Sequence, residues 1–222
     1  MDLPSIRRTI IKAMFSDDRL MNVLVLKGGN ALNLVHRIGA RASLDVDFSI
    51  EGDLEDLAEV HERAKRALEG RFESEGYVVF DTRFERRPPE ETDSRRGGYR
   101  LTFKLIESGR YREADLARMR REAVLIGSDQ ERKFRIEISK YEYCRGKQEA
   151  NVDDYTIYAY TPGMIAVEKL RAICQQMPEY GKRKGGTARS RDFYDITMVL
   201  AERETSLGTP DNRSLFAPIF AA

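Results

Sequence analysis

Cysteine and histidine are scarce in this sequence, and their scarcity disfavours several classes of site. The chain has two cysteines, Cys144 and Cys174, and two histidines, His36 and His61. No CxxC pair and no histidine cluster accompanies them, so neither a zinc site nor a disulfide framework is indicated. Neither histidine has a partner at the spacing of a catalytic triad. Zinc-dependent and triad-type hydrolase chemistry therefore receive little support, and a reducing compartment is expected.

Long hydrophobic runs and a strong net charge are also lacking. No apolar stretch approaches the ~20 residues of a membrane-spanning helix, and the N-terminal residues lack the apolar core of a signal peptide. Lysine and arginine number 38 against 37 aspartates and glutamates, for a net charge of +1. Charge alone therefore does not indicate nucleic-acid binding, although basic residues gather at 182–191. We expect a cytoplasmic protein that does not enter a membrane.

The remaining composition is that of a folded globular protein. Hydrophobic residues make up 41% of the 222 residues, and charged residues make up 34%. A chain of this length buries one main core with, at most, a helical appendage. We expect a core domain over residues 1–160 and a C-terminal helical region over residues 161–222 that completes the active site.

Hydrophobic periodicity predicts an α+β fold. Apolar residues at helical spacing predict helices at 4–15, 31–38, 54–70, 113–123, 162–173 and 191–202. Alternating or short apolar runs predict strands at 23–26, 44–50, 77–84, 99–106, 134–139 and 155–160. Mixed strands and helices that are followed by two closing helices indicate one α+β domain with a helical C-terminal part.

The predicted strand 44–50 carries two acidic residues on one face. Leu44 and Val46 belong to its apolar face, whereas Asp45 and Asp47 alternate with them on the polar face. Carboxylates at this spacing lie about 6.5–7 Å apart along a strand and can hold hard cations against a triphosphate. Such a pair also occurs on ordinary solvent-facing strands. On the polar face of the strand at 134–139, Glu137 is the candidate third carboxylate.

A glycine pair precedes this strand by one helix. Lys27, Gly28, Gly29 and Asn30 follow a short apolar run and open a predicted helix. Two glycines let backbone N–H groups approach phosphate oxygens without interference from Cβ atoms, so this turn is the predicted nucleotide-binding segment. It is not a P-loop, because GxxxxGK[ST] is absent, and a glycine pair alone is often simple strand-to-helix punctuation.

Four separated blocks give a more specific indication. They are LKGGNAL, RASLDVDF, IAVEKLRAI and RDFYDI, and together they span residues 26–196. In this order and spacing they resemble the AbiEii/AbiGii-type nucleotidyltransferase toxins of type IV toxin–antitoxin and abortive-infection systems, to which the MenT toxins are related. The resemblance implies a polymerase-β-like nucleotidyltransferase core with a mixed sheet, plus a helical C-terminal part.

The resemblance also implies roles for individual residues. Asp45 and Asp47 would bind the metal, Gly28 and Gly29 would face the phosphates, and the nucleotide pocket and catalytic site would be completed by Arg41, Ser43, Lys169 and Asp192. Glu137 is not settled by the family pattern and stays a predicted third metal ligand from the strand polarity. Without the motifs, Lys169 reads as a solvated helix lysine and Asp192 as an acid favoured near a helix N-terminus.

The implied activity is metal-dependent transfer of a nucleotide from an NTP, with release of pyrophosphate. The expected cofactor is Mg²⁺, with Mn²⁺ as the alternative. The expected acceptor is RNA, in particular the 3′ end of tRNA, whose modification would block translation; a protein acceptor stays open. An antitoxin encoded nearby is the expected partner. The alternative from another class is a non-catalytic nucleotide- or RNA-binding module of the same fold.

Overall fold

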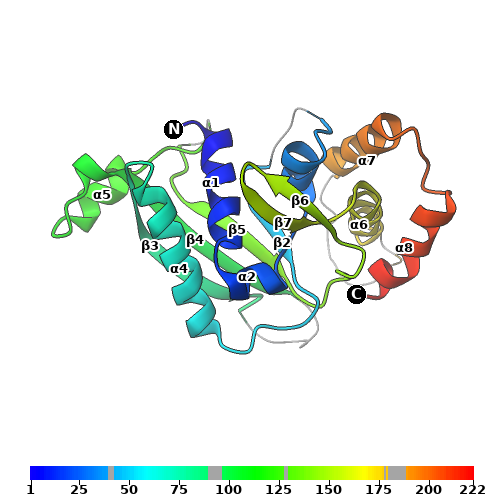
Figure 1. The fold of residues 1–222 in the computed structure, drawn as a ribbon, viewed down its shortest axis with the longest axis horizontal. Helices are drawn as coiled ribbons and strands as arrows, with labels where there is room; N and C mark the ends of the chain where they lie inside the picture. The colour runs from blue at the N-terminus through cyan, green and yellow to red at the C-terminus, as the bar shows by residue number, and fades with distance from the viewer. Residues whose placement is uncertain (40–42, 90–96, 128–129, 178, 180–188) are drawn as a thin grey trace.

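A mixed β-sheet with helices packed around it forms the body of the protein (Figure 1). The computed structural model describes residues 1–39, 43–89, 97–127, 130–177, 179 and 189–222. Within these residues seven strands form one sheet in the order β3-β4-β5-β2-β1-β7-β6. The β2–β5 and β1–β7 pairs are parallel and the other neighbours are antiparallel. The predicted α+β class with a mixed sheet and a helical C-terminal part is confirmed.

The elements have the following bounds. The strands are β1 (Val25–Leu26), β2 (Val46–Ser49), β3 (Tyr77–Arg87), β4 (Gly98–Glu107), β5 (Phe134–Ser139), β6 (Gln148–Val152) and β7 (Tyr155–Ala159). The α-helices are α1 (Leu3–Phe15), α2 (Asp18–Val23), α3 (Gly28–Asn30), α4 (Leu57–Glu73), α5 (Leu116–Glu122), α6 (Pro162–Cys174), α7 (Ser190–Glu202) and α8 (Pro210–Ala221). A π-helical turn, η1 (Ala31–Val35), continues α3, and a 3-10 turn, η2 (Ser108–Arg110), follows β4.

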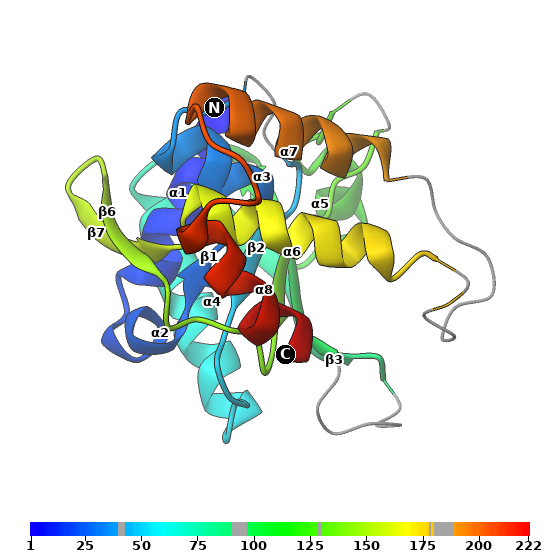
Figure 2. The same ribbon diagram turned by 90° about the vertical axis from the view of Figure 1, so that its right-hand side faces the viewer.

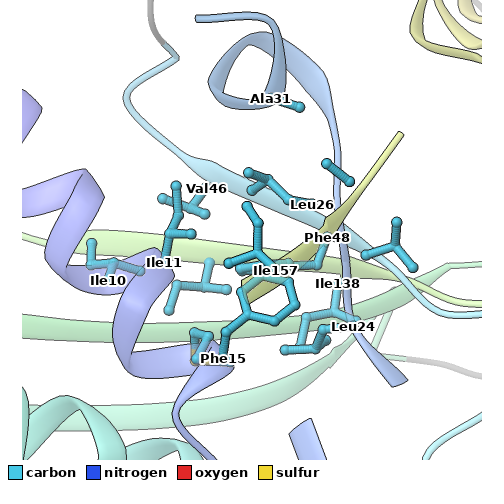
Figure 3. Packing of buried hydrophobic residues seen from close by; sticks show 14 of the residues in the cluster. Ile10, Ile11, Phe15, Leu24, Leu26, Ala31, Val46, Phe48, Ile138 and Ile157 are labelled. Carbon is cyan, nitrogen blue, oxygen red and sulfur yellow. The ribbon is translucent and has the colours of Figure 1, made fainter. Parts of the chain in front are cut away.

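One core joins the sheet to the helices on both of its sides. In Figure 3, Ile11 and Phe15 of α1 lie against Phe48 of β2 and Ile157 of β7. The same cluster of buried side chains extends to Ile219 of α8. Helices α6, α7 and α8 gather at one end of the molecule, where α6 packs on both of the others (Figures 1 and 2). Residues of α6 and α7 line the same cavity as Asp45 and Asp47 at the start of β2.

Four elements of the described chain were not predicted from the sequence. These are α2, β6, α8 and the 3-10 turn η2. Strand β6 pairs only with β7 at the end of the sheet, and its polar sequence lacks the apolar alternation that predicts a strand. Helix α8 contains Pro218, and its apolar residues are not concentrated on one face. Its hydrophobic periodicity therefore does not predict a helix.

Two apolar residues were placed wrongly. Val23 ends α2 instead of opening a strand, and its side chain is 41% exposed. Leu44 lies before β2 and is 49% exposed, whereas the alternation with Val46 predicts a buried side chain. Strand pairing of β2 with β1 and β5 begins only at Val46, so the period of two does not extend back to Leu44. None of the helices in the described part of the chain combines the length and apolar character needed to cross a membrane.

Candidate active site

The glycine turn lies directly against the second aspartate of the pair. The backbone N–H of Lys27 donates to the carbonyl of Asp47 at 2.9 Å, which fixes the end of β1 beside β2. Gly28 follows with φ +68°, and a Cβ atom built on it would lie 3.0 Å from Asp47 Oδ2. A side chain at Gly28 would be strained by this φ value and would press on the carboxylate. The turn therefore requires glycine here for both conformation and space.

Both aspartates line one cavity of about 590 Å³. Asp45 stands just before β2 and Asp47 lies within it, so the predicted common face is present. The backbone around Asp45 is held from two sides. Asn30, which is fully buried, donates through Nδ2 to the carbonyl of Asp45 at 2.7 Å, and Arg7 of α1 donates to the carbonyl of Ser43 at 2.9 Å. Asn30 thus positions an aspartate through its backbone.

The ionised form of Asp47 is destabilised by burial and by neighbouring acids, and Lys27 compensates this effect only in part. Burial raises the pKa of Asp47 to about 7, against the lowering effect of Lys27 and with further raising by Glu168 and Asp45. A carboxylate whose negative charge is incompletely compensated is a suitable ligand for a cation. The Asp47 side chain therefore has the chemistry that a metal ligand needs.

Lys27 belongs to a buried network of ion pairs behind the cavity. Its Nζ lies 2.6 Å from Glu168 of α6, 3.7 Å from Glu142 and 3.1 Å from Ser139 Oγ. Glu142 in turn accepts from Arg171 at 2.7 Å. Burial alone would lower the pKa of Lys27, but the charges of Glu168 and Glu142 outweigh it and raise that pKa. Lys27 is thus a charged side chain that lines the cavity and is held in place by its partners.

Two C-terminal helices bring a second set of charges to the same cavity. Lys169 of α6 lies 2.9 Å from Asp192 and 2.8 Å from Asp195, both in α7. Burial lowers the pKa of Lys169, but its bonds to Asp195 and Asp192 outweigh that effect and raise it. Arg189 lies 3.2 Å from the other oxygen of Asp192. Lys169 is therefore not a solvated helix lysine, and it joins α6 to α7.

Most of the predicted site residues meet at this cavity. Those that line it are Lys27, Gly28, Gly29, Ser43, Asp45, Asp47, Lys169 and Asp192. Glu137 stands opposite Asp47 in the β2–β5 ladder, but its carboxylate accepts from Arg100 Nε at 2.5 Å and does not line the cavity. Arg41 and the basic stretch 181–188 lie outside the described residues.

Sequence reasoning missed four residues that line the cavity. They are Leu44, Ser139, Glu168 and Ala172. Glu168 precedes Lys169 in α6 and so points about 100° away from it, toward Lys27, a residue 141 positions earlier. Its position inside the IAVEKLRAI block was the only available signal for Glu168. The partner itself lies too far along the chain to be inferred from local periodicity.

The donor set fits a divalent cation that shares its coordination with a substrate. Within the described part of the chain, no group of three or more histidine, cysteine, aspartate or glutamate side chains could by itself hold a metal ion. Mg²⁺ in enzymes that act on nucleotides is usually held by one or two carboxylates together with substrate phosphates and water. Asp45 and Asp47 supply that pair, and the adjoining Gly28 leaves room beside Asp47. The residues present therefore fit such an ion.

A comparison with protein-family models identifies the family to which this chain belongs. The model of the nucleotidyl transferase AbiEii toxin family, described as type IV toxin–antitoxin, matches residues 9–221. The chain belongs to the AbiEii nucleotidyl transferase toxin family. The resemblance inferred from the four blocks is thereby confirmed, and nucleotidyl transfer is the activity of the family. No curated protein matches the chain.

Solved structures resemble this AbiEii-family chain at low sequence identity. JHP933 from Helicobacter pylori superposes with a TM-score of 0.53 and 16% identity, covering 99% of this chain and 78% of that one. An antigenic nucleotidyltransferase-like protein from Paracoccidioides brasiliensis has a TM-score of 0.49 and 15% identity, with coverage of 96% and 86%. The antibiotic-resistance factor ANT(2'')-Ia has a TM-score of 0.42 and 15% identity, with coverage of 98% and 91%. The likeness to the H. pylori protein shows a shared fold alone.

Proposed function

We propose that the protein transfers a nucleotide from an NTP to an acceptor hydroxyl, with Mg²⁺ or Mn²⁺ as cofactor and an RNA 3′ end, in particular that of tRNA, as acceptor. The observation that carries this proposal is the convergence of the Gly28 turn, the Asp45–Asp47 pair and the Lys169–Asp192 pair on one cavity. Family membership supports nucleotidyl transfer. The RNA acceptor rests on the family resemblance and on the basic sequence 182–191, of which Arg189 and Arg191 line the cavity.

The residues of the cavity divide the work between binding and orientation. Asp45 and Asp47 would hold the ion, which when bound neutralises charge that builds on the phosphate oxygens. The Gly28–Gly29 backbone would face the phosphates, because no side chain intervenes there. Lys169 fixes Asp192 and carries a charge beside the cavity. Holding the α-phosphate in line with the acceptor hydroxyl supplies much of the rate enhancement in such transfers.

Labelled nucleotides test the activity. The purified protein is incubated with each α-labelled NTP, Mg²⁺ and total RNA, and label in RNA and in protein is measured separately. We expect label in RNA of tRNA size and its loss in Lys169→Met, because that change frees Asp192 and Asp195 from their common partner. Label in protein would show that the acceptor is a protein and not RNA. NTP binding without transfer under any condition would support the non-catalytic module instead.

A toxin of this family also implies a partner that restrains it. We propose an antitoxin encoded next to this chain, as the type IV toxin–antitoxin description of the family suggests. A soluble protein active on nucleotides suits the cytoplasm, where NTPs and tRNA are found. Growth of cells that express the chain with and without the neighbouring reading frame tests this part of the proposal.

A further inference from the structure

In the described part of the chain, four basic side chains line the cavity, and three of them are already neutralised by carboxylates. Lys27 pairs with Glu168 at 2.6 Å. Lys169 is shared by two aspartates of α7, and Arg189 lies 3.2 Å from one of them. These bonds occupy donors that a phosphate would otherwise use. The ion-paired residues therefore organise the walls of the site more than they attract an anion.

Arg191 differs from the other three. It lines the cavity and is exposed, and among the described residues it forms neither an ion pair nor a side-chain hydrogen bond. An arginine presents five N–H donors in a planar fork that fits two phosphate oxygens at once. Arg191 thus keeps its whole donor set available at the cavity.

The position of Arg191 in α7 does not explain why an arginine is found there. It stands in the first turn of α7, where the partial positive charge of the helix end disfavours a cation. Folding of α7 alone would be better served by a neutral or acidic side chain, such as the neighbouring Asp192. A basic residue that opposes the helix dipole and has no ion-pair or hydrogen-bond partner within the described segments is best explained by a ligand outside the fold.

The charge of the cavity indicates which ligand that is. Its described side chains include more carboxylates than cations, among them Asp45, Asp47 and Glu168. A triphosphate carries several negative charges, and a monophosphate carries at most two. The β- and γ-phosphates of a triphosphate would add negative charge to a cavity in which carboxylates already outnumber cations. These phosphates would therefore need a protein cation in addition to the ion at the aspartates, whereas a monophosphate would not.

We propose that Arg191 is the cation that binds the β- and γ-phosphates of the NTP, and that it thereby selects triphosphates over shorter nucleotides. This inference rests on the proposed function, since it assigns part of the same substrate. Lys169 keeps its role of holding Asp192 and Asp195. The selectivity of the site then resides in a residue whose removal leaves its ion pairs intact.

Binding measurements on Arg191→Gln test this assignment. The four NTPs are titrated by calorimetry in the presence of Mg²⁺, followed by the di- and monophosphate of the nucleoside that binds most tightly. Loss of a charge-assisted bidentate contact should weaken NTP binding about 10- to 100-fold. Monophosphate affinity should change less than about threefold, because that ligand does not reach the residue. Arg191→Lys should recover part of the loss.

A matched control separates local contact from net charge. Arg213→Gln removes the same charge from an exposed position on α8 that does not line the cavity, and should leave all affinities unchanged. Parental NTP affinity in Arg191→Gln, or an equal loss for mono- and triphosphate, would overturn the assignment and leave the proposed function standing. A parent protein that binds no NTP would overturn both.

Discussion

Replacement of Asp47 by asparagine is expected to lower nucleotidyl transfer by on the order of a thousandfold and to stabilise the metal-free protein. Transfer falls because the amide cannot supply the anionic ligand that the Asp45–Asp47 pair provides beside Gly28. Stability rises because the carboxylate is held in a partly buried position among other acids, and its pKa is about 7. Under the proposed function, the same side chain would lower the stability of the fold and be required for the reaction.

The stability effect has a defined dependence on pH. The pKa of Asp47 rises from 3.8 to about 7 on folding, so the native protein binds more protons than the unfolded chain between those values. The free energy of unfolding must then fall as pH rises from about 4 to about 7, and level off above that. Asp47→Asn removes this dependence. Its advantage over the parent should grow across the window to about 2–4 kcal/mol, at ~1.4 kcal/mol per pKa unit.

Urea unfolding with a chelator present, at pH 5 and pH 8, measures this difference. Asp45→Asn is the matched control, because Asp45 is more exposed and also lines the cavity. It should impair transfer while changing the stability of the metal-free protein little. If Asp47→Asn transferred nucleotide at the parental rate, the two-carboxylate site would be wrong. If it were less stable than the parent at pH 8, the electrostatic account of Asp47 would be wrong.

Local sequence patterns were sufficient to predict the parts of the site that lie on short segments. The alternation around Asp45 and Asp47 predicts a strand with both side chains on one face, and both do line one cavity. The glycine pair predicts a turn between strand and helix, and Gly28 indeed has the positive φ that favours glycine. These features depend on residues a few positions apart, where periodicity and turn chemistry are informative.

Contacts between distant segments could not be predicted in the same way. Lys27 was assigned to the nucleotide, yet its ammonium group bonds to Glu168 of α6, which lies 141 positions later in the chain. Leu44 fits the apolar alternation but lies outside the paired strand and faces the cavity. Whether Glu137 binds a metal stays a prediction. In each case the deciding factor is which element packs alongside, and local periodicity does not report it.

The buried ion pair between Lys27 and Glu168 should make Glu168→Gln strongly destabilising. The two side chains are only 10% and 16% exposed, and their charged atoms lie 2.6 Å apart. Removal of one partner leaves the other charge in a poorly solvated place, which typically costs about 3–5 kcal/mol. Lys27 keeps a weaker neighbour in Glu142 at 3.7 Å, so we expect a loss of about 3 kcal/mol, measured by urea unfolding.

Two further variants show whether this loss comes from burial of an unpaired charge. Glu51→Gln breaks the exposed pair with Arg145, whose side chains are 55% and 80% exposed, and should cost much less, because solvent screens such a pair. The double variant Lys27→Met with Glu168→Leu removes both charges and should recover most of the stability that Glu168→Gln loses, because apolar side chains of similar size often replace a buried pair without penalty. A loss in Glu168→Gln as small as that in Glu51→Gln would contradict the burial argument. A double variant as unstable as Glu168→Gln would show instead that the loss of stability comes from the changed shape of the side chains at positions 27 and 168, and not from an unpaired charge.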